Sequence, residues 1–540
     1  METHELKSHT SVTSRGEAKT GQSVRQRDNA HLQRMGKKPV LKRNFGLLSI
    51  FGFSCTILAL SLDLWRSTSP PCNVLSCTTL IASSGGSGGT IYAFIFAWTG
   101  TAAIFVILSE LASMWGQYHW AAMLAPIRYQ KFLSYITGWW AVLGWQTALA
   151  SLSFLTGTAI QGAAVLGNSH YDSLPWQGTL LVWASLGCAL LANLAGGKVL
   201  PRIETITLIV HILGFFGIMI PLAYMSEHRS KEEVFLQLSN NGGFKTQGLS
   251  WFVGMTSCAF ALAGGDAAVH MSEEVKNASR VVPRVIMLSV AINGCLGFGM
   301  MITVLFCNSN QKDALDSPTG YPFMAIFYEA TNSLPGSLAM CSIVLINYCC
   351  SLVGMLAAAS RQLWSFSRDK GVPGWRWWSQ VPPTRELPVY SIILTVLIST
   401  MLALINIGSS VALDDILSMA VSGSYLSYLM VSILLFYRRI RGEVFRFDDS
   451  ENDICNVPGA KLVWGPFHCP GIWGILVNAF AIIYNIIVVF FSFWPSTVNP
   501  SVEEMNWSVL GIGGSSLLAI VYYFVCARHV YTGPVRELSE

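Results

Sequence analysis

Charged side chains are scarce in this chain. Of its 540 residues only 12% are Asp, Glu, Lys or Arg, whereas soluble domains carry about 25%. Hydrophobic residues make up 52%, and the mean hydropathy is +0.48. A chain with so little charge cannot keep most of its surface in water. This excludes an ordinary soluble domain and predicts a protein that is embedded in a lipid bilayer.

Several signatures of chemistry are also missing. No Gly-rich loop ends in Lys-Ser or Lys-Thr, so an ATP-driven pump is not expected. No nucleophile–base pattern and no cysteine–histidine spacing for a metal is visible, so we expect no catalytic residue, no enzyme activity, no metal and no other cofactor. Residues 1–44 are polar and lack the apolar core of a signal peptide, which predicts a disordered cytosolic tail.

Long apolar stretches fill the rest of the chain. A hydrocarbon core of about 30 Å needs about 20 apolar residues per helix. The stretches predict an all-α integral membrane domain over 45–530, followed by a short tail at 531–540. The twelve predicted transmembrane helices are 45–65, 90–113, 133–166, 176–196, 203–226, 249–272, 282–307, 333–366, 388–407, 411–437, 471–494 and 507–527.

The basic residues predict how these helices are oriented. With a cytosolic N-terminus, 29 Lys and Arg flank the inner ends of the helices and 5 flank the outer ends. Cytosolic loops are enriched in Lys and Arg, so both termini are expected in the cytosol and the segment 227–247 outside. The net charge of +4 then reflects membrane topology, and no nucleic-acid partner is expected.

The sixth predicted helix carries a glycine pair beside a carboxylate. The candidate substrate-binding residues there are Phe260, Ala261, Leu262, Gly264, Gly265 and Asp266. Glycines disfavour a continuous helix, and an opened backbone inside the bilayer needs a polar partner, which indicates a transporter. Asp266 is expected either to bind a cation, a proton or the substrate's charge, or to cap the lower half of the helix. Phe260 is the aromatic candidate for contact with an ammonium group.

Two amides add to the candidate site. Gln146 and Asn347 lie in the middle of the third and eighth predicted helices, where each amide must find a partner. Bonding between helices is one role, and lining the substrate pathway is the other. His270 shows no metal or catalytic spacing and is expected to pack or to bond within a loop, and Trp145 is expected to be a packing or interfacial belt residue.

The segment after Asp266 contains the acidic pair Glu273-Glu274, followed nine residues later by Pro283-Arg284. This pattern resembles the amino acid–polyamine–organocation transporters, and closely the fungal amino acid/choline permease branch, which includes permeases for 4-aminobutyrate and choline. The resemblance covers about 45–530. Further matching motifs stand in the same order at 116–120, 132–139, 322–323, 330–333 and 360–369.

The resemblance implies a fold and an activity. The fold is two inverted five-helix repeats, here 45–226 and 249–437, followed by two extra helices at 471–527. The first helix of each repeat is broken, which adds Gly52, Phe53 and Ser54 to the substrate site, in a broken segment that runs to Thr56. The expected activity is proton-coupled transport of a small amino acid or amine across the plasma membrane.

The chain departs from the family pattern at two places, 61–84 and 114–116. The first lies in the outer half of the first helix and the loop after it, and the second implies a short deletion near the cytosolic side. Two alternatives to active transport therefore stay open. One is a transporter-like nutrient sensor, and the other is a permease that its divergent first repeat leaves inactive.

Overall fold

The structure is a computed structural model. It describes residues 41, 43–58, 85–114, 119–168, 170–196, 199–307, 314, 317–405, 412–446, 455–456, 459–502 and 505–533. Most of the predicted tails 1–44 and 531–540, and most of the two divergent segments, lie outside these residues. The described part is almost entirely helical, which confirms the all-α fold class.

Each of the twelve predicted transmembrane helices has a counterpart in the described residues. These are α2 Leu47–Leu58, α4 Gly86–Met114, α6 Gln130–Gly167, α7 Pro175–Ala195, α8 Val199–Met225, the pair α10 Gln247–Ala261 and α11 Ala267–His270, α12 Ala278–Cys307, α15 Leu334–Arg368, α17 Val389–Ala403, α19 Ala412–Ile440, α20 Gly471–Ser492, and α21 Ser508–Tyr522, which continues through the π-helical η3 Tyr523–Ala527 into α22 Arg528–Val530. Within the described residues, nine helices are long and apolar enough to cross a bilayer.

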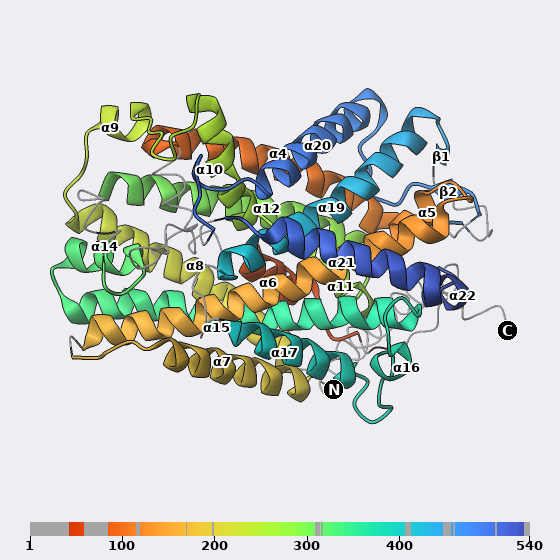
Figure 1. Ribbon diagram of the computed structural model, residues 1–540, viewed down its shortest axis with the longest axis horizontal. Helices are drawn as coiled ribbons and strands as arrows, with labels where there is room; N and C mark the ends of the chain where they lie inside the picture. The colour runs from red at the N-terminus through yellow and green to blue at the C-terminus, as the bar shows by residue number, and fades with distance from the viewer. Residues whose placement is uncertain are drawn as a thin grey trace, which may run out of the picture.

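Short elements cap the two ends of the bundle. They are α5 His119–Leu124, α9 Lys231–Leu236, the 3-10 turn η2 Ser272–Glu274, α14 Pro322–Thr331, α16 Trp375–Trp378, and the parallel two-residue strands β1 Val444–Phe445 and β2 Leu462–Val463. Figure 1 shows α9 and α14 at one end of the molecule and α5, α16, β1 and β2 at the other. The loops predicted to be outside and those predicted to be cytosolic are therefore separated, as alternating spans require.

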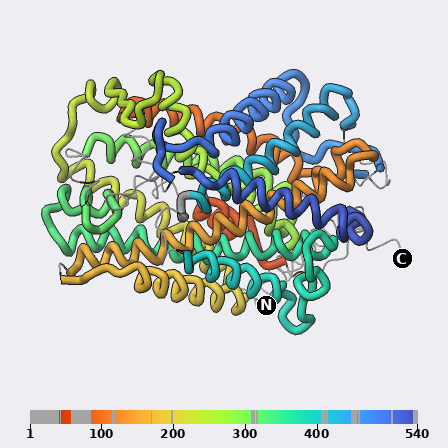
Figure 2. Tube along the Cα trace, viewed as in Figure 1, coloured from red at the N-terminus to blue at the C-terminus, as the bar shows by residue number. Residues whose placement is uncertain are grey.

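The helix α2 lies in the middle of the molecule. Figure 2 shows it enclosed by later parts of the chain, and Phe53, Ser54 and Cys55 are each 0% exposed. It packs against α8, α12 and α15. These contacts bring the start of the first predicted repeat against its own fifth helix and against two helices of the second repeat.

The break expected in helix 1 at Gly52–Thr56 is wrong. The helix α2 runs unbroken from Leu47 to Leu58, and the predicted outer half beyond it lies outside the described residues. The Thr56 hydroxyl donates to the Phe53 carbonyl at 3.2 Å, a bond back to its own backbone that a continuous helix tolerates. With 12 residues, the described α2 covers about 18 Å at 1.5 Å per residue.

Candidate functional site

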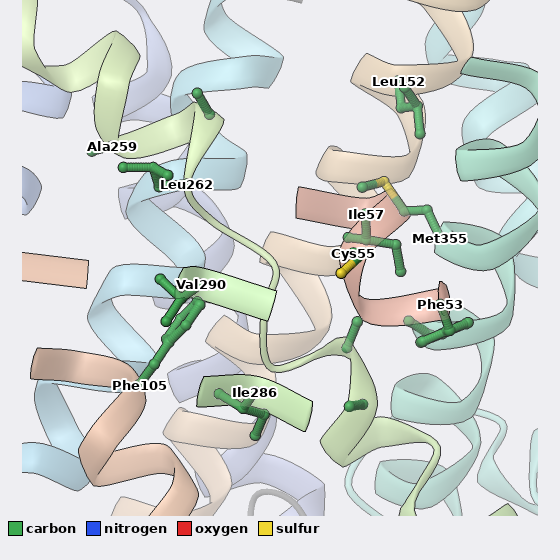
Figure 3. Close-up of a cluster of buried hydrophobic side chains, with 14 of the residues drawn as sticks. Phe53, Cys55, Ile57, Phe105, Leu152, Ala259, Leu262, Ile286, Val290 and Met355 are labelled. Atoms are coloured by element: carbon green, nitrogen blue, oxygen red, sulfur yellow. The ribbon is translucent and has the colours of Figure 1, made fainter. Parts of the chain in front are cut away.

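The sixth helix is interrupted where the glycine pair predicted it. The helix α10 ends at Ala261 and α11 begins at Ala267. Gly264 has φ of +92°, in the region that favours glycine, and a Cβ at this position would lie 2.9 Å from Ile57 Cγ2. A Cβ at Gly265 would overlap the ring of Phe105. Figure 3 shows the non-helical chain between Leu262 and α11, with Ile57 on one side and Phe105 on the other.

The interruption leaves backbone groups without partners. Among the described residues, nothing hydrogen-bonds to the N–H groups of Gly264, Gly265 and Asp266 or to the carbonyls of Leu262 and Ala263. Ala263 and Gly264 are half-buried, whereas their neighbours Leu262 and Gly265 are buried. Unpaired backbone groups are costly in a bilayer. The N–H groups suit a carboxylate and the carbonyls suit an ammonium group.

The carboxylate of Asp266 is held by three side chains from other turns and helices. The Tyr428 hydroxyl of α19 donates to Oδ1 at 2.6 Å, and the Trp145 indole of α6 donates to Oδ2 at 3.4 Å. His270 Nε2 lies 3.2 Å from the same Oδ2. Asp266 is 5% exposed and makes no side-chain hydrogen bond that caps α11. The side chain of Asp266 is therefore engaged by Tyr428, Trp145 and His270 and does not cap α11.

His270 joins the carboxylate in one buried unit. Its ring meets the Trp145 ring edge-on at 4.9 Å between centroids, and its Nδ1 has no hydrogen-bond partner within the described chain. A carboxylate and an imidazole at this distance can share or exchange a proton. Sequence reasoning treated Trp145 and His270 as packing residues and missed Tyr428. The signal for Tyr428 was a phenol in an apolar helix, since a buried hydroxyl needs a partner.

The other candidates of the second repeat lie apart from this carboxylate. Ala261 is the buried last residue of α10. Phe260 lines a pocket with Thr256, Ser257 and Ser418, between α10, α19 and the end of α20, and the residues 262–266 are not part of that pocket. Phe260 therefore lines this neighbouring pocket and not the interruption of helix 6.

The two candidate amides make contacts within and between helices. Gln146 donates to Thr395 Oγ1 of α17 at 3.1 Å, so it faces another helix and not the interruption. Asn347 donates to the Ile343 carbonyl of its own helix at 3.1 Å, and its Oδ1 has no partner in the described chain. Gln146 fits the role of bonding between helices.

The three candidates of helix 1 pack against three different helices. A Cβ at Gly52 would overlap the Glu204 carbonyl of α8. The Phe53 ring lies 3.5 Å from where a Cβ at Gly354 of α15 would stand. Ser54 donates to Ser289 Oγ of α12 at 3.0 Å. The structure thus places these residues in helix packing and does not bring them to Asp266.

The acidic pair after α11 closes the end of the bundle that carries the predicted cytosolic loops. Arg361 Nε donates to Glu274 Oε1 at 2.9 Å, and Arg368 Nη2 donates to Glu273 Oε1 at 2.8 Å. Both arginines come from α15. Phe45, just before α2, also exchanges two backbone hydrogen bonds of 3.1 Å with Glu274 and Lys276. The ends of helices 1, 6 and 8 on the predicted cytosolic side are therefore joined by these bonds.

Comparison with known proteins identifies the family of this chain. The sequence profile of the amino acid permeases matches residues 45–515. The chain belongs to the amino acid permease family. It is therefore a multi-pass membrane transporter and not an enzyme.

Proteins with similar sequences are named as transporters or permeases. The chain is 27% identical to the choline transporter of Saccharomyces cerevisiae over 493 residues, which cover 89% of this chain and 81% of that protein. It is 26% identical to the GABA-specific permease of the same yeast, over 95% of this chain and 86% of that protein. A permease of Oryza sativa, the BAT1 homologue, is 27% identical over 95% of this chain and 96% of its own length.

Proposed function

We propose that this permease is a secondary active transporter that moves a small amino acid or amine, such as 4-aminobutyrate or choline, together with a proton. The observation that carries the proposal is the set of unpaired backbone groups at 262–266 beside the Asp266 carboxylate. The similarity to a choline transporter and a GABA-specific permease supports an amine-bearing solute.

The groups at the interruption match the two ends of such a solute. The free N–H groups of Gly264 and Gly265 can receive a carboxylate, and Asp266 with the free carbonyls can receive an ammonium group. A zwitterion such as 4-aminobutyrate would use both sets, whereas choline would use only the second. We assign proton binding to the Asp266–His270 pair, because each partner can carry a proton and the two lie 3.2 Å apart.

We place the permease in the plasma membrane, with both termini in the cytosol and the segment 227–247 outside. The excess of basic residues on the predicted inner side supports this orientation. The position of α9 at one end of the bundle and of α5, α16 and the two strands at the other is consistent with it.

Uptake in cells that lack their own permeases tests the proposal. Labelled 4-aminobutyrate, choline, polyamines and the common amino acids are supplied one at a time, at several external pH values, with surface protein measured in parallel. We expect uptake of one amine-bearing solute, and a faster rate at low external pH. A protein that reaches the surface and transports none of them contradicts the proposal.

The alternative function as a nutrient sensor is tested by the thermal stability of the purified protein. A sensor that binds without turnover would be stabilised against heat by its ligand, because a ligand that binds only the folded state raises the melting temperature. Stabilisation of the purified protein by a solute that the cells do not accumulate would favour the sensor. The transporter predicts both stabilisation and accumulation.

A further inference from the structure

A second buried acid lies away from Asp266. Glu204 of α8 is 0% exposed, and the described residues give it no ion pair. Its Oε2 lies 3.4 Å from the Thr56 hydroxyl of α2. Its Oε1 has no hydrogen-bond partner within the described chain and lies 3.1 Å from where a Cβ at Gly354 of α15 would stand. The carboxyl group is therefore enclosed between three helices.

The hydrogen-bond count at this site favours the neutral acid. A threonine hydroxyl has one proton, and the Thr56 hydroxyl has two acceptors, the Phe53 carbonyl at 3.2 Å and Glu204 Oε2 at 3.4 Å. An ionised Glu204 would take this proton for Oε2 and leave Oε1 without a donor in the described chain, while the Phe53 carbonyl keeps its backbone bond within α2. A protonated Glu204 can donate to Thr56, which then donates to Phe53, so that one chain of bonds satisfies all three groups.

Among the described residues, the charges around Glu204 do not offset an ionised form. Of the ionisable side chains on the packed helices, Cys350 of α15 is close enough to interact with it, and it carries no positive charge. Arg361 lies seven residues beyond Gly354, about 10 Å along the helix axis, and is paired with Glu274. His211 lies the same distance along α8. Ionised carboxylates in a bilayer are costly without a partner.

The seam between α2 and α8 is closed at this point. A Cβ at Gly52 would stand 3.0 Å from the Glu204 carbonyl carbon and 3.2 Å from Leu208 Cβ, so the backbones touch and leave no space for water. The end of α2 is held by side chains, because Asn293 donates to the Cys55 carbonyl at 2.7 Å and Ser351 to the Thr56 carbonyl at 2.8 Å. These two bonds can be released without unwinding a helix.

We propose that Glu204 is a second proton-binding site of this permease, distinct from Asp266. It holds its proton while α2 is docked against α8, as in this structure, and exchanges it with water when the seam opens. Its carboxylate then accepts a proton from a hydronium ion, which leaves as water, before the seam closes again. This inference rests on the proposed proton-coupled transport and assigns part of the coupling to the contact between helices 1 and 5.

Infrared spectroscopy tests the protonation directly and needs no substrate. The protein is reconstituted into liposomes, and spectra are compared across a pH series in light and heavy water. The carbonyl stretch of a protonated carboxylic acid is resolved from the amide bands. We expect Glu204→Gln to remove one such band at neutral pH, and the control Glu232→Gln, at an exposed position in α9, to remove none.

A second variant covers the case in which Glu204→Gln does not fold. Thr56→Val keeps the side-chain shape and removes the hydroxyl, so the same band should move to higher frequency as the acid loses its acceptor. An unchanged band in Thr56→Val, or a full set of bands in folded Glu204→Gln, overturns the assignment.

A transport measurement separates this inference from the proposed function. Liposomes carry a pH gradient of one unit, with the membrane potential clamped to zero, and labelled 4-aminobutyrate and choline are the probes. For one proton per solute, the wild type accumulates its solute up to about tenfold, because one pH unit is a factor of ten. Glu204→Gln should lose this accumulation and keep exchange of labelled for unlabelled solute.

The outcomes differ for the two proposals. Full accumulation by Glu204→Gln overturns the second proton site and leaves the proposed function standing. A wild type that neither accumulates nor exchanges either probe counts against the proposed substrates, and the infrared result then decides the Glu204 assignment alone.

Discussion

In the proposed function, Asp266 takes part in both substrate binding and proton coupling. Its two oxygens receive hydrogen bonds from Tyr428 and Trp145, and His270 lies beside them. Asp266→Asn keeps the size of the side chain and one acceptor oxygen, and removes the charge. Hydrogen bonds to charged groups contribute about 1.5–3 kcal/mol, so we expect initial uptake to fall about ten- to a hundredfold. Its dependence on external pH should flatten relative to the wild type.

Tyr428→Phe is the matched comparison for Asp266→Asn. It removes a single donor to Asp266 and keeps the ring, so uptake should fall less and the pH dependence should remain. Both variants are measured as initial rates across a pH series, normalised to surface protein. Superimposable curves for wild type and Asp266→Asn would remove this carboxylate from the mechanism.

The sequence predicted one partner of this network and not the others. Asp266 was visible because an acid in an apolar helix is unusual. Tyr428 is 162 positions away, and only the packing of α19 against α6 brings it to the interruption. Glu204 escaped notice because it stands at the predicted boundary of the fifth helix, where a carboxylate is expected to reach water. Burial by α2 and α15 is what makes it unusual.

At the scale of helices, the apolar stretches predicted the spans well, because lipid allows few alternatives to a helix of about 20 residues. Glycine predicted the break in helix 6, since Gly264 needs its positive φ. The break carried over to helix 1 had no such signal. Gly52 is a single glycine, which disfavours a helix by only about 1 kcal/mol, and α2 is continuous there.

The glycine pair gives a prediction for α10 and α11. Gly265→Leu would overlap the Phe105 ring, and overpacking of this kind costs about 1–3 kcal/mol. We expect transport to be abolished while the protein still reaches the membrane. The measurement is uptake against surface abundance. Gly513→Leu is the control, because Gly513 in α21 is exposed and has open space around it.

A compensating pair distinguishes crowding at the site from general misfolding. Gly265→Ala should reduce uptake, and Phe105→Ala in the same chain should restore part of it by making room for the methyl group. Wild-type uptake by Gly265→Leu at normal abundance would refute the site at the interruption.

The ion pairs between α15 and the segment after α11 give a second prediction at this scale. Glu273→Arg and Arg368→Glu each place two like charges together at the inner end, and like charges repel. We expect each to lower uptake severalfold and the double exchange to restore most of it. Arg385→Glu, at an exposed position before α17, is the control. Equal loss in the single and double variants would show that the pair does not act as a unit.

At the scale of the whole molecule, one count of basic residues predicts on which side of the membrane each end of the bundle lies. The 29-to-5 distribution predicts that α9 is outside and that the loop containing Arg385 is cytosolic. Glu232→Cys and Arg385→Cys place single reporters at exposed positions of these two segments. We expect a membrane-impermeant maleimide added to intact cells to label the first, and to label the second only after the cells are opened.

The native cysteines set the background for this measurement. Cys188, Cys295, Cys349 and Cys526 are exposed in the structure, but all four lie on helices predicted to cross the membrane, where lipid would shield them from a maleimide in water. Unmodified wild-type protein measures whatever labelling they still give. Labelling of Glu232→Cys only in opened cells would show that every predicted helix crosses the membrane in the opposite direction. Both termini would then lie outside, because an even number of helices keeps them on one side. The arginine pairs with Glu273 and Glu274 would then close the outer end of the pathway, and uptake would have to begin from the face that carries α5 and α16.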